Sequence, residues 1–122
     1  MDEDLDIQIH KVGSIPVVVL SGDIDAYTCS NLRETIVGLL SEDECSLVIS
    51  MANVNYVDSC GLGTLVGGLR RVKERNGVLA ICGANPQIER VFKITGLGKM
   101  FSLFDDEEQA VRSLGDPKLS AS

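Results

Sequence analysis

Three short apolar runs place the strongest constraint on how this chain can fold. Pro16–Leu20, Ser46–Met51 and Val78–Cys82 are rich in aliphatic residues and contain no charged side chain. A strand without polar alternation is buried on both faces, which is typical of parallel sheets covered by helices. Pro16 fits the start of its strand, where no backbone donor is needed. We therefore expect a layered α/β structure built around these runs.

The segments between these runs carry apolar residues at the spacing of amphipathic helices. The second such helix should stop at Asn76-Gly77, with Gly77 supplying the left-handed residue. Asn85-Pro86 predicts the start of a shorter helix, with Asn85 as its N-cap. The stripes consist of Leu32, Ile36, Leu39 and Leu40 in the first helix, of Leu62, Leu65, Val66, Leu69 and Val72 in the second, and of Ile88, Val91 and Phe92 in the third.

The remaining segments complete an alternation of strands and helices. Leu5–Val12 alternates apolar and polar residues and predicts a half-buried strand. Met100–Phe104 predicts a last short strand, and Glu107–Leu114 predicts a terminal helix. Gly22–Asp25 and Ala52–Val57 are expected to be loops.

The expected order is β-β-α-β-α-β-α-β-α, which makes the fold class α/β with a mixed, mostly parallel β-sheet. Right-handed crossovers made in sequential order place the helices mainly on one face. The 122 residues fit a single domain. We expect this domain to span residues 1–114 and residues 115–122 to form a flexible C-terminal tail.

The charge and cysteine content exclude several classes of function. The formal net charge of −7 disfavours binding to nucleic acid and to anionic membranes. No apolar run approaches the roughly 20 residues of a membrane span, and the acidic N-terminus does not resemble a signal peptide. A cytoplasmic protein with free thiols is the expectation. The cysteines are Cys29, Cys45, Cys60 and Cys82.

No residue pattern indicates catalysis. The chain has neither a G-x-x-x-x-G-K-[ST] phosphate loop nor a G-x-S-x-G nucleophile elbow. His10 is the single histidine, and its strand offers no triad context. The long, irregular cysteine spacings do not match a zinc site. We expect no enzyme activity, no metal and no cofactor.

The stretch Val57–Thr64 is the most informative, because it joins a strand to a helix. Asp58 is placed to cap the helix, which puts Ser59 at the first helical position, facing solvent. Unpaired N–H groups and the macrodipole favour a phosphate at this position. Gly61 and Gly63 would let another backbone approach. Local physics alone favours an ordinary cap and a structural serine here.

Two motifs resemble those of the anti-sigma factor antagonists, a family of STAS domains. Asp58–Gly63 resembles the D-S-S-G-L-G signature, and Leu20–Asp25 resembles the L-x-G-[DE]-[IL]-D segment after the second strand. Val78–Pro86 and Val91–Leu97 resemble the stretch after the central helix. The resemblance runs in the right order from about Ile7 to Leu114.

The resemblance implies a bacterial regulator switched by phosphorylation at Ser59. Its partners would be a GHKL-type anti-sigma factor kinase, bound by the unphosphorylated form, and a PP2C-type phosphatase that reverses the modification. Alternatives are a STAS subunit of a stressosome or lipid-transport assembly, and a small enzyme or nucleotide-binding protein. The expected partner-binding residues are Asp23, Asp25, Asp58, Ser59, Cys60, Gly61 and Leu62.

Several of these residues have a second interpretation. Asp23 and Asp25 would orient the partner, or one of them would only cap the following helix. Leu62 would be a partly exposed apolar contact or part of the core. Cys60 departs from the second serine of the signature, and it would be either a redox-active thiol at a helix N-terminus or an inert buried one.

Overall fold

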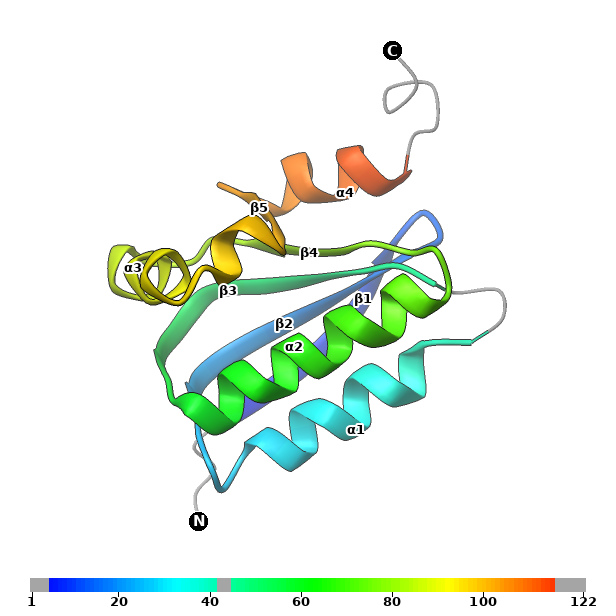
Figure 1. Cartoon of the computed structure of the whole chain (residues 1–122). Coiled ribbons are helices and arrows are strands. Elements are labelled where there is room, and N and C mark those ends of the chain that lie inside the picture. The colour runs from blue at the N-terminus through cyan, green and yellow to red at the C-terminus, as the bar shows by residue number, and fades with distance from the viewer. Residues whose placement is uncertain (1–4, 42–44, 116–122) are drawn as a thin grey trace.

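The computed structural model describes residues 5–41 and 45–115 as one five-stranded sheet with helices packed on it (Figure 1). The strand order is β1-β2-β3-β4-β5, with β1 antiparallel to β2 and the other neighbours parallel. The elements are β1 (Leu5–Val12), β2 (Ile15–Ile24), α1 (Cys29–Leu39), β3 (Leu47–Val57), α2 (Ser59–Glu74), β4 (Leu79–Cys82), α3 (Pro86–Thr95), the 3₁₀ turn η1 (Leu97–Lys99), β5 (Ser102–Phe104) and α4 (Glu107–Gly115). The expected element order and fold class are confirmed. Gly115, expected to begin the tail, is instead the last residue of α4, and the rest of the expected tail lies outside the described residues.

The central strands are apolar along their length because both faces of the sheet are covered. Leu20, Ile49 and Ile81 belong to a large core cluster that also contains buried residues of α1, α2 and α3. Val17 and Val48 belong to a second, smaller cluster on the opposite face. Alternate residues of one strand therefore enter different cores, as the period of two requires.

Helix α4 covers the opposite face from α1 and α2 (Figure 1). Its Ala110 is fully buried against the second cluster. His10 of β1 and Glu107 of α4 join strand to helix through a bond of 2.8 Å between Nε2 and Oε2. The helices thus lie mainly, but not all, on one face, as expected.

Two segments expected to be loops are strands. Gly22–Ile24 continues β2, and Ala52–Val57 continues β3. The two extensions pair with each other in parallel, Gly22 opposite Val54 and Ile24 opposite Val57, after register shifts. Ladder hydrogen bonds between neighbouring strands override the local turn preference of Gly22 and the aspartate beside it. The extension brings the carboxyl-terminal ends of β2 and β3 together, and α1 and α2 begin just beyond these ends.

The end of α2 differs from the expectation in one residue. Asn76 has the left-handed conformation, with φ of 62°, and Gly77 does not. A Cβ at Gly77 would collide with the backbone carbonyl of Cys45. Gly77 is therefore required for close backbone approach, while Asn76, a residue that tolerates positive φ, makes the turn.

Gly77→Ala should reduce the free energy of unfolding by about 2–3 kcal/mol, because the added methyl group meets backbone that cannot rotate away. Asn76→Gly should change it by less than about 1 kcal/mol, since relief of the left-handed conformation offsets the added chain entropy. Urea denaturation of both variants measures the difference. Equal midpoints for the two variants would contradict this assignment.

Candidate functional site

Helices α1 and α2 begin side by side because they follow neighbouring parallel strands. Ile24 ends β2 and pairs with Val57, which ends β3. The backbone N–H of Asp58 then donates to the carbonyl of Ile24 at 3.0 Å. The β2–α1 and β3–α2 connections therefore meet at the carboxyl edge of the sheet, where ligands and partners of open α/β sheets usually bind.

The first turn of α2 has the predicted geometry. Asp58 is the N-cap, and its carboxylate accepts from the backbone N–H of Gly61 at 3.0 Å. Ser59 is the first helical residue and is exposed. Within the described part of the chain, the Ser59 hydroxyl makes no hydrogen bond. A hydroxyl that is exposed, uncommitted and next to unpaired N–H groups can accept a phosphoryl group without loss of an internal contact.

Gly61 fixes this turn against the sheet. A Cβ at Gly61 would lie 2.7 Å from Cγ2 of Ile24 and 2.9 Å from the Ile24 carbonyl oxygen. Gly63, on the exposed side of the helix, has nothing within 4 Å of such a Cβ. The close approach that glycine permits at Gly61 is thus that of β2 in the same chain.

This contrast predicts opposite effects of one substitution at two positions. Gly61→Ala should lower the free energy of unfolding by about 1–3 kcal/mol, because a methyl group is forced against Ile24. Gly63→Ala should raise it by about 0.5–1 kcal/mol, because alanine has the higher helix propensity and meets no atoms. Urea or thermal unfolding compares the two variants, and a stable Gly61→Ala protein would refute the packing role.

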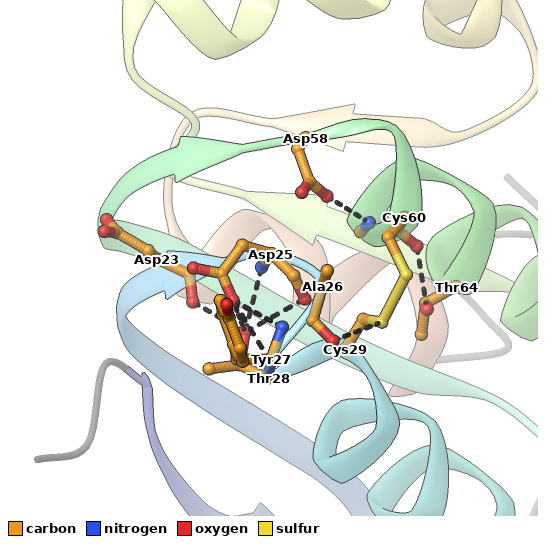
Figure 2. The surroundings of a disulfide bond; sticks show 10 residues. Asp23, Asp25, Ala26, Tyr27, Thr28, Cys29, Asp58, Cys60 and Thr64 are labelled. Carbon is orange, nitrogen blue, oxygen red and sulfur yellow. Dashed lines mark hydrogen bonds between the residues drawn. A yellow bond between two sulfur atoms is a disulfide. The ribbon is translucent and has the colours of Figure 1, made fainter. Parts of the chain in front are cut away.

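The two aspartates of the β2–α1 connection have different roles (Figure 2). The Asp25 carboxylate accepts from the backbone N–H groups of Tyr27 at 2.9 Å and Thr28 at 3.1 Å. The Thr28 hydroxyl completes the turn by donating to the carbonyl of Asp23 at 2.9 Å. The carboxylate of Asp23 points away from these bonds in Figure 2. The Asp25 carboxylate therefore closes the turn that precedes α1 and does not cap the helix itself, whose N-cap is Thr28. The side chain of Asp23 stays available to a partner.

Leu62 combines the two expected roles, core packing and partial exposure as an apolar contact. Its side chain is half-buried and packs against the main core cluster. The remaining part faces solvent in the turn that carries Ser59. One residue thus anchors the helix and adds apolar surface beside the serine.

Cys29 and Cys60 form a disulfide between the first turns of α1 and α2 (Figure 2). Their Cα atoms are 6.4 Å apart, although 31 positions separate the two residues in the sequence. The expectation of free thiols is wrong for this pair, and so is a buried Cys60, because Cys60 is exposed. The spacing gave no signal, since only the parallel pairing of β2 and β3 brings the two helix starts together.

Tyr27 is a surface feature that sequence patterns did not reveal. It lies in the same connection as Asp25, and 86% of its surface is exposed. Exposed tyrosines near the centre of a binding surface often contribute much of the binding energy. A lone aromatic residue within a polar loop, in a chain with two tyrosines, was the available signal.

Among the described residues, neither a membrane-spanning helix nor a metal-binding cluster is present. No helix there has the length and apolar character needed to cross a membrane. The same residues contain no group of three or more His, Cys, Asp or Glu side chains arranged to hold a metal ion.

The fold and motifs match a known family. The family model of the STAS domain matches residues 6–110, which is most of the chain. The chain therefore belongs to the STAS domain family. Its relatives and their structures place it more closely, among the anti-sigma factor antagonists of that family.

Three similar proteins carry this placement. An anti-sigma F factor antagonist of Paenibacillus polymyxa is 29% identical over 112 residues, covering 91% of this chain and 96% of the relative. An anti-sigma-B factor antagonist of Staphylococcus epidermidis is 35% identical over 91 residues, covering 75% and 84%. The crystal structure of an anti-sigma factor antagonist from Mycobacterium paratuberculosis superposes with a TM-score of 0.83 at 25% identity, covering 92% and 95%.

Proposed function

We propose that this chain is a cytoplasmic bacterial anti-sigma factor antagonist controlled by phosphorylation of Ser59. The unphosphorylated protein binds a GHKL-type anti-sigma factor kinase, and the sigma factor is thereby released. Phosphorylation by that kinase prevents binding, and a PP2C-type phosphatase restores the binding form. The exposed Ser59 at the capped start of α2 is the observation that carries the proposal.

The position of Ser59 supports a switch that acts at the surface. A phosphoserine adds about −1.5 to −2 charges and three acceptor oxygens. The start of a helix favours that charge by about 0.3–1 kcal/mol through its macrodipole and free N–H groups. Asp58 already holds the first turn, so the added group disturbs no bond of the folded protein. Phosphorylation therefore changes what a partner meets and leaves the fold intact.

The aspartates near Ser59 strengthen the effect of the added phosphate on partner binding. Asp23, Asp25 and Asp58 lie at the same edge of the sheet as Ser59, as the β2–β3 register requires. Because this surface is already negative, the added phosphate repels an acidic surface of the partner and prevents close contact. We assign the docking surface to Asp23, Asp25, Asp58, Ser59, Cys60 and Leu62, seated by Gly61, with Tyr27 as an added apolar contact.

Ser59→Asp should abolish detectable binding to the anti-sigma kinase while changing the free energy of unfolding by less than about 1 kcal/mol. Ser59→Ala should bind and resist phosphorylation. Isothermal titration calorimetry measures binding, and mass spectrometry after incubation with kinase and ATP locates the phosphate. A Ser59→Ala protein that is still phosphorylated at the wild-type rate would refute the assignment of the acceptor.

Tyr27→Ala should weaken binding to the same kinase at least tenfold, because truncation of a tyrosine that acts as a binding hot spot costs about 2 kcal/mol or more, and tenfold in affinity is about 1.4 kcal/mol. Its exposure means that stability should stay within about 0.5 kcal/mol of wild type. Val12→Ala is the matched control, since Val12 is 41% exposed at the β1–β2 turn, at the opposite edge of the sheet. Equal affinities for the two variants would exclude Tyr27 from the interface.

A further inference from the structure

We infer that Cys29 and Cys60 form a reversible redox site that controls how fast Ser59 is phosphorylated. The inference rests on the proposed role of Ser59 and adds a second modification beside it. Closing the disulfide joins the first turn of α2 to α1, directly next to the serine. The oxidised form would accept phosphate slowly and so stay in its binding state.

The fold places the two cysteines in the first turns of neighbouring helices. Cys29 is the first residue of α1, and Cys60 is the second residue of α2. Their Cα separation of 6.4 Å lies within the range that a disulfide normally bridges. Hydrogen bonds hold the two helix starts independently of the sulfur atoms: the Asp25 carboxylate closes the turn before α1, and the Asp58 carboxylate caps α2. The reduced protein therefore keeps the two thiols in position to react.

The surroundings of the pair suit a reaction with small reagents. Cys60 is exposed, whereas Cys29 is 9% exposed and lies beneath it. Cys60 also lines a groove of about 430 Å³ between α1 and α2, together with Arg33 and Arg71. Accessible cysteines are the ones that small oxidants reach most readily. Cys60 is thus suited to react first and Cys29 to resolve the product.

Cys82 shows what an unreactive thiol in this fold looks like. It lies in β4 with almost no exposed surface. Burial raises the pKa of the Cys82 thiol above its usual value, and the nearby Glu107 and Asp106 add to this effect. Cys82 therefore stays protonated and out of reach of small oxidants, unlike the exposed Cys60.

The oxidant we assign is a peroxide and the reductant a cellular dithiol. The Cys60 thiolate attacks one peroxide oxygen, the O–O bond breaks, and Cys60 sulfenic acid forms with release of hydroxide, which takes up the proton lost by the thiol and leaves as the first water. The Cys29 thiolate then attacks that sulfur, forming the S–S bond and releasing a second water after protonation. Two thiols and one hydrogen peroxide thus give one disulfide and two waters. A dithiol reverses the step and is itself oxidised to a disulfide. Disulfides in reducing compartments are usually of this transient, sensing kind.

The disulfide should slow phosphorylation of Ser59 because phosphoryl transfer requires accurate positioning of the hydroxyl group. The kinase must bring the hydroxyl in line with the transferred phosphoryl group, at about 3–3.5 Å. A displacement of about 1 Å can cost two orders of magnitude in rate. Without the disulfide, only hydrogen bonds and packing hold the first turn of α2, so this turn yields to the kinase more readily than when Cys60 is covalently tied to Cys29. The disulfide removes this freedom from the residue that follows Ser59.

The test compares initial rates of Ser59 phosphorylation by the anti-sigma kinase of the same organism, with ATP, before and after treatment with hydrogen peroxide. Oxidised wild type should be phosphorylated at least tenfold more slowly, and dithiothreitol should restore the rate. Cys60→Ala, which cannot form the bond, should be unaffected by peroxide. Cys45→Ala, which keeps the pair, should respond like wild type. Peptide mapping under both conditions should show the Cys29–Cys60 bond only after oxidation.

Equal rates for the oxidised and reduced wild type, with the bond confirmed by mapping, would overturn the inference. A Cys60→Ala protein that is slowed as much as wild type would also overturn it. The proposed function fails separately, when the fully reduced protein is not phosphorylated at Ser59 at all. Mapping of the disulfide needs no kinase, so it distinguishes failure of the redox step from failure of the phosphorylation step.

Discussion

The hydrogen bond from the Asp58 backbone to the carbonyl of Ile24 is the contact on which the functional edge depends. It joins the start of α2 to the end of β2, and Gly61 allows the helix to lie against the same residue. The Asp58 carboxylate then caps the turn from the other side. With these contacts in place, Ser59 is exposed at the first position of α2. The serine is thus presented by rigid elements, although it stands at a surface where a partner can reach it.

In this arrangement the residues that stabilise the fold are separate from those of the proposed docking surface. One hydrophobic core on each face of the sheet stabilises the domain. Of the proposed docking surface, the partly buried Leu62 packs against the larger core, and the other named residues belong to neither cluster. Charge can therefore be added at Ser59, and a bond can form or break at Cys60, without opening the cores. A partner would sense each modification through local charge and local mobility. The same edge can in this way carry two different signals.

Much of the fold could be predicted from the sequence because the central strands are apolar on both faces and the helices have clear stripes. Asp58 as N-cap and Ser59 as first helical residue followed from the same local rules. The extensions of β2 and β3 could not be predicted, because their pairing overrides the local preference of Gly22 and its neighbours. The disulfide, the closeness of Gly61 to Ile24 and the exposed Tyr27 all depend on which segments become neighbours. A spacing of 31 residues carries no such information.

The central claim is that phosphorylation changes the surface at Ser59 and leaves the architecture unchanged. Backbone amide NMR with hydrogen exchange on the unmodified and the Ser59-phosphorylated protein tests it most directly. The account predicts shift changes confined to the β2–α1 connection and the first turns of α1 and α2, with unchanged protection in β2, β3 and β4. Loss of protection across the central strands on phosphorylation would contradict it.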